Sequence, residues 1–275
     1  MKIFRDPQKL QKWCRTCRLA GETVALVPTM GYLHEGHLSL IAKAKAKGAD
    51  EIVVSVFVNP VQFCPGEDYE KYPRDEKADL AKCRAAGATA VFFPTPENMY
   101  LDRHSVYVTE EDLSKGLCGA RRPGHFRGVC TVVAKLFNLA HPNFAVFGQK
   151  DYQQAQVIRR MVRDLNFDLD VVVAPIVREP SGLARSSRNA YLSPVERERA
   201  RALSRALSAV RAGRAVAAEA RRIRAELEAA SLRVDYVEFV DGETLAPVKK
   251  VAKGVCVLLA AYDGKTRLID NRVMK

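Results

Sequence analysis

The stretch VPTMGYLHEGHLSLI, residues 27–41, decides the fold of this 275-residue chain. The residues that lead into it, from Val24, are apolar and are typical of the end of a buried strand. From Leu38 onward, apolar residues and lysines recur in a pattern that suits a helix. Between these two runs lies a turn that contains two glycines and two histidines. The turn either only connects the strand to the helix or forms the binding site of a polyanion.

The position of His34, Gly36 and His37 favours the anion site. A short H-x-G-H match is weak by itself, but this one falls directly after a strand and at the start of a helix. Free N–H groups and the positive end of the helix dipole favour phosphate there. Gly36 allows close backbone approach, and imidazoles can donate to phosphate oxygens. The alternative is a pair of ordinary surface histidines.

Strand-like and helix-like runs alternate over the first two thirds of the chain. The strand candidates are 24–28, 51–58, 89–94, 105–109, 144–148 and 170–177, and the helix candidates are 7–20, 37–47, 75–86, 128–140 and 151–165. Continuous Val, Ile and Phe strands separated by helices predict a parallel sheet covered on both faces. The fold class is therefore α/β, a doubly wound layer whose ligands bind beyond the carboxyl ends of the strands.

The pattern changes after about residue 177. A helical pair begins at Ser193 and Pro194, a good N-cap followed by a proline at the first helical position. Short strands are expected at 234–240, 255–262 and 267–273, joined by Asp-Gly turns at 241–242 and 263–264. We expect two domains, residues 1–176 and a smaller α+β domain at 177–275.

Composition excludes some classes of protein. Hydrophobic residues make up 48% of the chain and charged residues 28%, as in ordinary soluble enzymes. No apolar run reaches the ~18 residues of a membrane span. The N-terminal segment MKIFRDPQKL lacks an apolar signal core, so the expected location is the cytoplasm. The seven cysteines are scattered, and we expect free thiols, with a redox pair or a metal clip at Cys14 and Cys17 as the alternatives.

The net charge of +12 permits nucleic-acid binding, but anionic small substrates explain it equally well. Much of the excess lies in 197–224, where arginines alternate with Ala and Leu at helical spacing. That segment contains no aromatic residue, whereas a nucleic-acid surface would interleave aromatic and basic side chains. A solvated helix face is the better interpretation.

Further polar segments follow predicted strands. SSR at 186–188 offers two hydroxyls and a guanidinium, which would suit a triphosphate, although an ordinary polar loop is the alternative. FGQKDYQQ at 147–154 contains Gly148, which permits close backbone approach, and Lys150, which can neutralise phosphate. FVNPVQF at 57–63 offers Asn59 and Gln62, neutral groups that suit a hydroxyl-bearing acid.

RRPGHFRGV at 121–129 is basic and contains His125, and it is either a mobile lid or a plain loop. The other four segments share one placement, at the carboxyl ends of predicted strands. A single active-site crevice explains that placement.

The chain resembles the pantothenate synthetase (pantoate–β-alanine ligase) family. The resemblance rests on six ordered segments: VPTMGYLHEGHLSLI, FVNPVQF, YPRD, RRPGHFRGV, FGQKDYQQ and SSRNAYLS. It implies a Rossmann-like nucleotidyltransferase domain of the HIGH-motif superfamily, a small C-terminal lid domain and a homodimer. It also implies a two-step reaction with Mg²⁺: ATP and (R)-pantoate give pantoyl adenylate and pyrophosphate, and β-alanine then gives pantothenate and AMP.

The resemblance also implies roles for individual residues. The catalytic set would be His37, His34, Lys150, Ser186, Ser187 and Arg188, with His37 as the proton-donating residue. The ATP site would add Met30, Gly31, Gly36, Gly148, Gln149, Asp151, Val177 and Arg185. Pantoate would contact Gln62, Gln154, Asn59, Pro28 and Thr29, with Gln62 also facing β-alanine. Asp79 matches a carboxylate on the metal side.

Two positions depart from the family pattern. Gln149 stands where glutamate is common, and Arg185 stands where methionine is common. We expect the Arg185 side chain to turn outward, because the reaction does not need a charge there. The competing interpretations are another nucleotidyltransferase that keeps the nucleotide on its product, and an RNA-binding module derived from a synthetase core.

Overall fold

The computed structural model describes all 275 residues, and they form two compact units. The first contains Met1–Gly148 and Gln154–Ala174, and the second contains Gln149–Gln153 and Pro175–Lys275. The pentapeptide Gln149–Gln153, which includes the first two residues of a helix, thus belongs to the second unit although the residues on both sides of it belong to the first.

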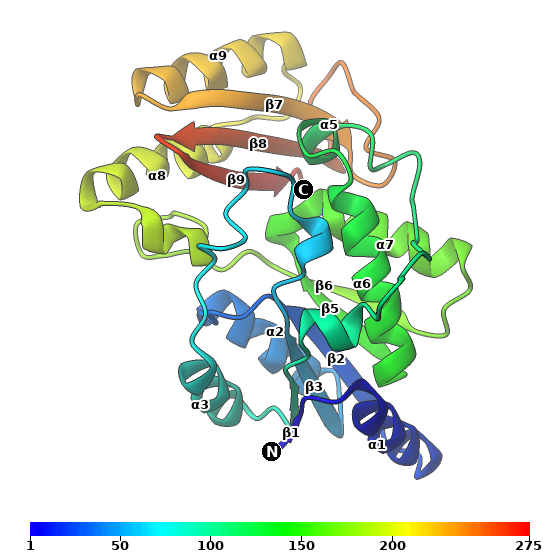
Figure 1. Cartoon of the computed structure of the whole chain (residues 1–275). Helices are drawn as coiled ribbons and strands as arrows, with labels where there is room; N and C mark the ends of the chain where they lie inside the picture. Colours follow the sequence, from blue (N-terminus) through cyan, green and yellow to red (C-terminus); the bar gives the residue numbers. More distant parts are fainter. The chain divides into compact units, whose positions relative to one another are not determined.

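A sheet of six parallel strands forms the centre of the first unit (Figure 1). Its strands are β1 (Lys2–Phe4), β2 (Val24–Thr29), β3 (Glu51–Val56), β4 (Ala90–Phe92), β5 (Phe144–Gly148) and β6 (Asp170–Ala174). Their order in the sheet is β1-β4-β3-β2-β5-β6. From β2, the strands β3 and β4 are therefore added on one side, and β5 and β6 are added on the other side.

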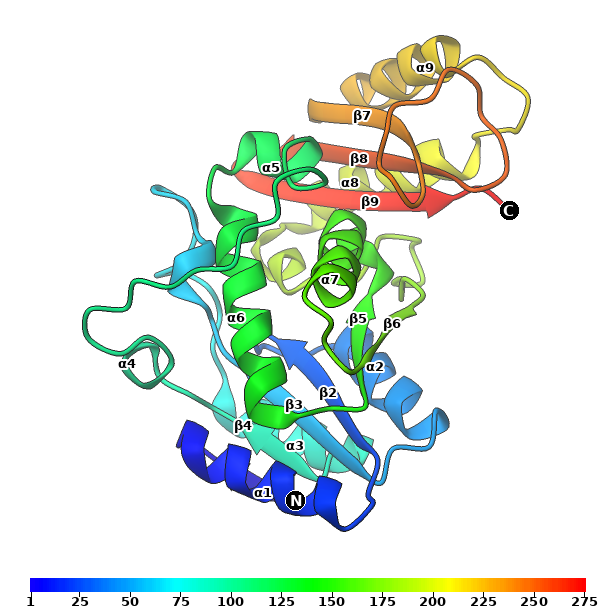
Figure 2. The ribbon, with the colours of Figure 1, turned by 90° about the vertical axis from the view of Figure 1, so that its right-hand side faces the viewer.

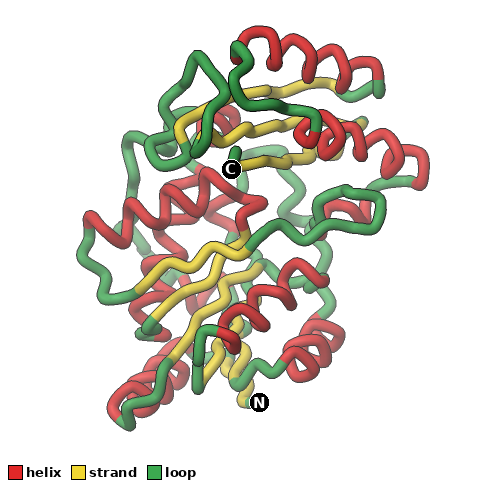
Figure 3. Tube along the Cα trace, turned by 180° about the vertical axis from the view of Figure 1, so that it is seen from behind, coloured by secondary structure: helices red, strands yellow, loops and turns green.

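Helices cover both faces of this sheet (Figures 2 and 3). The helices in this part of the chain are α1 (Pro7–Leu19), α2 (Glu35–Ala46), α3 (Glu76–Ala86), α4 (Pro96–Met99), α5 (Leu117–Arg121), α6 (His125–Ala140) and α7 (Tyr152–Asp164), with a short 3-10 helix η1 at Pro60–Gln62. The apolar core beneath α2 and α3 joins Leu40, Ile41 and Cys83 to Val27 and Val54 of the strands. Because alternate strand residues face opposite sides, nearly continuous apolar strands are what this layer requires.

The second unit has a three-stranded antiparallel sheet in the order β7-β8-β9. Its strands are β7 (Arg233–Asp241), β8 (Val255–Asp263) and β9 (Thr266–Val273), and its helices are α8 (Pro194–Ser208) and α9 (Val216–Ala229), with 3-10 helices η2 (Gln149–Asp151) and η3 (Ser187–Tyr191). Leu203, Leu207, Ile223 and Leu227 of the two helices pack in one core with the sheet. Ser193 caps α8 as predicted.

The predicted α/β fold class is confirmed, and the differences are local. No strand forms at 105–109, because Val106 is 74% exposed and the Val108 amide donates to the Thr131 hydroxyl instead of to a strand. The edge strand β1 was not predicted, because three residues are too few to show a periodicity. The basic segment 121–129 is only partly a loop, since α6 begins at His125.

The connections of the small sheet also differ from expectation. Asp263 and Gly264 form the predicted tight turn, with Asp263 paired to Thr266 across it. Asp241 and Gly242 do not join two strands directly, because residues 242–254 intervene before β8. The Asp241 carboxylate accepts instead from the amides of Glu243 and Thr244, which closes a turn within that longer connection. No helix of the structure is both long and apolar enough to cross a membrane.

Candidate active site

The carboxyl end of β2 lies at the point where the strand order reverses. β2 pairs with β3 on one side and with β5 on the other. The strands after β2 in sequence are therefore added first on one side of it and then on the other. Open α/β sheets bind ligands at such a switch point. Met30 and Gly31 follow β2 directly, and Gly148 ends β5. The first unit thus places three predicted site residues at the expected edge.

His34 and His37 begin α2 and cap it with their own rings. His34 is the N-cap, and its Nδ1 accepts from the Gly36 amide at 3.1 Å. The Nδ1 atom of His37 accepts from the His34 amide at 3.3 Å. Because a backbone N–H can only donate, each Nδ1 is the unprotonated nitrogen and each ring carries its proton on Nε2. The rings lie 4.1 Å apart between centroids, so two N–H donors occupy one helix N-terminus.

Asp79 of α3 holds the turn that precedes these histidines. Its carboxylate is buried and accepts from the Tyr32 amide at 2.8 Å and from the Leu33 amide at 2.7 Å. Lys82, one turn later, donates to the Leu33 carbonyl at 2.6 Å. Burial raises the pKa of Asp79, while the two amides oppose the shift. Gly31 adopts φ +81°, and a Cβ there would lie 3.0 Å from Asp79 Oδ2.

The residues of the first unit that we predict to bind pantoate differ in their burial and in their hydrogen bonds. Thr29 donates to the Ser55 carbonyl at 2.8 Å and accepts from the Gly31 amide at 3.2 Å, so its hydroxyl shapes the turn. Asn59 and Gln62 are buried at η1 and bond to each other at 3.0 Å. Pro28 is half-buried in β2, and Gln154 is half-buried in α7.

The pentapeptide Gln149–Gln153 is fixed within the second unit. Asn271 of β9 donates to the carbonyls of Gln149 and Lys150, both at 2.9 Å, and accepts from the Gln149 side chain at 3.2 Å. Tyr152 donates to the Gly242 carbonyl at 2.8 Å. The Lys150 ammonium lies 3.1 Å from the Asp151 carboxylate. The backbone beside Lys150 is therefore held firmly, while its side chain has a carboxylate partner next to it.

The segment with the two serines is also rigidly attached to the second unit. Arg178 forms a bidentate pair with the buried Asp270, at 2.7 and 2.9 Å. The Arg185 amide donates to the Val177 carbonyl at 2.9 Å, which closes the loop between them. Ser186 then caps η3 by accepting from the Arg188 amide at 3.3 Å.

Within this segment Ser187 is buried, while Ser186 and Arg188 are half-buried. These three residues are therefore consecutive at the start of η3, with Ser186 as its N-cap.

Comparisons with known proteins identify the family. The family model for pantoate–β-alanine ligase matches residues 2–273. The chain belongs to the pantoate–β-alanine ligase family. It is 55% identical to a pantothenate synthetase of Myxococcus xanthus, over 98% of this chain and 94% of that one. It is 50% identical to the pantothenate synthetase of Thermotoga neapolitana, over 100% of both.

Solved structures of the family match the whole chain. The pantothenate synthetase of Thermus thermophilus superposes with a TM-score of 0.92 at 45% identity, over 99% of both chains. The pantoate–β-alanine ligase of Francisella tularensis, solved in complex with β,γ-ATP and β-alanine, superposes with a TM-score of 0.84 at 31% identity, over 99% of this chain and 97% of that one.

The structure also reveals residues that the motifs did not single out. Tyr100 bonds to Asn59, His125 bonds to the Gln62 carbonyl, and Asn271 holds the Lys150 backbone. His125 lies in a segment that supported the family resemblance, and it was given no role there. Tyr100 and Asn271 lie in stretches without a distinctive pattern, so only the folded structure shows the contacts that they make.

In this ligase Arg185 is paired rather than fully solvated. Its side chain is 31% exposed, and its guanidinium lies 3.8 Å from the Glu179 carboxylate. The expected outward turn into water is therefore only partly realised. Arg197 shares Glu179 at 3.1 Å, so this carboxylate lies beside two arginines.

We expect Arg185→Met to change the Kd for ATP by less than about threefold, because the Arg185 charge is balanced by Glu179 and screened by salt. An ATP titration monitored by calorimetry, at low and at high salt, measures this. A loss of about tenfold that high salt largely removes would show that the guanidinium acts directly on the triphosphate.

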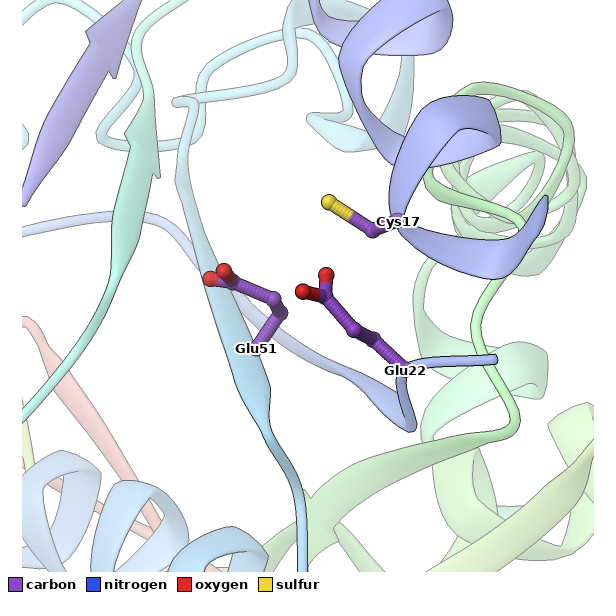
Figure 4. A group of neighbouring side chains, drawn as sticks. All are labelled: Cys17, Glu22 and Glu51. Carbon is purple, nitrogen blue, oxygen red and sulfur yellow. The ribbon is translucent and has the colours of Figure 1, made fainter. Parts of the chain in front are cut away.

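A second group of titratable side chains lies in the first unit, at the amino ends of β2 and β3 (Figure 4). The Cys17 thiol and the carboxylates of Glu22 and Glu51 lie within 4.8 Å of one another. Burial and a hydrogen bond to Glu22 raise the pKa of Cys17 to about 11, so the thiol keeps its proton near neutral pH. All seven cysteines are free thiols, as predicted.

Proposed function

We propose that this chain carries out the reaction of its family through a pantoyl adenylate. A pantoate carboxylate oxygen attacks the α-phosphorus of ATP, and the bond to the bridging oxygen breaks to release pyrophosphate. The β-alanine amine then attacks the acyl carbon, loses a proton and displaces AMP. The observation that carries the proposal is the pair of Nε2–H donors at the start of α2, on His34 and His37.

These donors suit the first step. Negative charge grows on the α-phosphate and on the departing pyrophosphate, and donors already in place stabilise it without reorganising. A helix N-terminus adds its own positive potential. His37 is the residue that we assign to the leaving group, because its proton lies on the nitrogen that faces away from the helix cap.

The second unit supplies the other phosphate ligands in this proposal. Lys150 and Arg188 carry the positive charge, and Ser186 and Ser187 supply hydroxyl donors. The residues that we place around the nucleotide are Met30, Gly31, Gly36, Gly148, Gln149, Asp151, Val177 and Arg185. The fixed backbones of the pentapeptide and of the serine segment support these assignments, because pre-organised donors are the ones that favour a transition state.

We assign pantoate to Gln62 and Gln154, whose amides can bond both hydroxyl and carboxylate oxygens. Pro28 and Thr29 would lie against the substrate from the end of β2. Asn59 acts through Gln62, since the atoms that it has for bonding are engaged by the protein.

Magnesium enters this proposal with ATP, because Mg²⁺ keeps several waters and binds mainly to substrate phosphates. Asp79 remains a prediction as a metal-side carboxylate. Both of its oxygens already accept backbone N–H groups, which fits a structural anchor better than a metal ligand. No step of the proposed reaction therefore depends on a bond between Asp79 and the ion.

We also propose roles for the two domains, an oligomeric state and a location. Residues 1–176 would bind nucleotide and pantoate, and residues 177–275 would act as the lid domain. The protein would be a homodimer, as the family resemblance implies, and would be located in the cytoplasm. A sedimentation experiment tests the dimer.

The half-reactions can be separated by isotope exchange. We expect ATP–pyrophosphate exchange to require pantoate and to proceed without β-alanine, because the adenylate forms before the amine enters. AMP release should require all three substrates. If exchange needed β-alanine, a direct ligation would replace this mechanism, and a product that retained the nucleotide would favour another nucleotidyltransferase.

A further inference from the structure

The backbone of Gln62 is fixed by α6. Gly128 packs so closely on η1 that a Cβ at this position would lie 2.5 Å from the Val61 carbonyl oxygen and 2.6 Å from the Gln62 nitrogen. His125 Nδ1 lies 2.8 Å from the Gln62 carbonyl oxygen. Since a carbonyl can only accept, that nitrogen carries the proton and donates. The main chain of Gln62 is thus held from two sides, and only its side chain can vary.

Backbone groups determine which end of the Asn59 amide points where. The Val61 N–H, which can only donate, lies 3.3 Å from Asn59 Oδ1. The Gly128 carbonyl, which can only accept, lies 3.2 Å from Asn59 Nδ2. The oxygen and the nitrogen of Asn59 are therefore assigned by their partners and not by the shape of the amide.

The orientation of Gln62 follows from that of Asn59. Asn59 Nδ2 donates to Gln62 Oε1 at 3.0 Å, so the oxygen of Gln62 faces the asparagine. Its Nε2 is the opposite end and lies 3.2 Å from the Met30 sulfur, beside the turn that follows β2. The donor end of Gln62 thus points to the edge of the sheet where the predicted site residues gather.

Tyr100 completes this chain of bonds. It is the C-cap residue that follows α4, and its hydroxyl donates to Asn59 Oδ1 at 2.7 Å. Burial raises the pKa of Tyr100, so the hydroxyl keeps the proton that it donates. The ring packs edge-on against His104, with centroids 5.0 Å apart, and lies 6.4 Å from the Phe57 ring. Tyr100 therefore bonds Asn59 from a fixed position.

We propose that Tyr100 is a positioning residue for pantoate: through Asn59 it holds Gln62 with its N–H₂ group turned to the substrate. The site then presents a donor, and it selects an acid with an accepting oxygen at that position. An amide that turned over would present an acceptor and would repel a carboxylate. This inference rests on the proposed role of Gln62 in binding pantoate.

The test is Tyr100→Phe, which removes the hydroxyl and keeps the ring. In pantoate-dependent ATP–pyrophosphate exchange we expect the KM for pantoate to rise about five- to tenfold, the effect of one hydrogen bond of about 1–1.5 kcal/mol. The KM for ATP should stay within about twofold. Tyr107→Phe is the matched control, because Tyr107 is 37% exposed and packs against His104 through its ring. It should change neither constant.

The hydrogen bonds from Tyr100 to Asn59 and from Asn59 to Gln62 form a relay, and a second variant tests its direction. In Asn59→Asp the new carboxylate can accept but not donate, so Gln62 would have to turn its N–H₂ inward. We expect a larger rise in the pantoate KM than for Tyr100→Phe, and no further rise when both changes are combined. Effects of the two changes that simply add would contradict a shared relay.

The possible outcomes separate the two proposals. An unchanged pantoate KM in Tyr100→Phe, with a parent enzyme that shows pantoate-dependent exchange, would overturn the relay alone. Equal rises in both KM values would assign Tyr100 a purely structural role and would also overturn it. A parent protein without pantoate-dependent exchange would overturn the proposed function itself.

Discussion

His37→Ala is expected to slow adenylate formation by about 10²–10³-fold, the loss typical of one transition-state donor. The ring carries its proton on Nε2, because its Nδ1 accepts from the His34 amide, and alanine supplies neither group. Single-turnover formation of adenylate from ATP and pantoate measures the effect. The KM for pantoate should change little, because the donor acts on charge that develops only during the reaction.

His37→Glu separates the donor from the helix cap. Glutamate at the third helical position can accept from the N-cap amide, as in an ordinary capping box, so α2 should keep its start, but its carboxylate has no N–H to donate. We expect this variant to retain the thermal stability of the parent and still to lose most of the adenylation rate. Near-normal adenylation in both variants would remove His37 from the mechanism.

Asp79→Ala should cost about 2–4 kcal/mol of unfolding free energy and most of the activity. Two amides of the turn, at Tyr32 and Leu33, would lose their acceptor, and each unsatisfied buried donor costs about 1–3 kcal/mol. The Tyr32 amide is only partly buried, which keeps the sum below the upper limit. Denaturant unfolding gives the stability, and single-turnover kinetics give the rate.

Asp75→Ala is the matched control for this change. Asp75 caps the same helix, but it is exposed and accepts only from the Ala78 amide. The expected cost is about 1 kcal/mol of unfolding free energy, with nearly normal adenylation.

Magnesium titration of Asp79→Asn distinguishes a structural anchor from a metal ligand. An anchor leaves the Mg²⁺ dependence unchanged, whereas a metal ligand would move it to concentrations about tenfold higher or more.

Local patterns predicted the elements whose signals are themselves local. The strand at Val24, the capping residue Ser193 and the helix start at His34 each depend on neighbours within four residues. The strand expected at 105–109 did not form. Its β-branched and aromatic residues favour a strand, but the Val108 amide donates to the Thr131 hydroxyl of α6, a partner 23 residues away that no local pattern indicates.

The supporting residues of the site lay outside the reach of pattern analysis. Tyr100 is separated from Asn59 by 41 residues, and Asn271 from Lys150 by 121 residues. A tyrosine after a short helix and an asparagine in a strand are ordinary in sequence. Their contacts come from groups that the fold brings to them, a side chain for Tyr100 and backbone carbonyls for Asn271, and local sequence does not show these contacts.

The pentapeptide Gln149–Gln153 has a consequence for the inheritance of this protein. It consists of the three residues that follow β5 and the first two residues of α7, yet the carbonyls of Gln149 and Lys150 accept from Asn271, which lies 121 residues after Lys150. A cut after Ala174 would thus separate Lys150 from the asparagine that holds its backbone. Neither unit is formed by one uninterrupted stretch of the sequence. Recombination that exchanged the C-terminal part between distant relatives would have to preserve this pairing, so the two parts are expected to have been transmitted together.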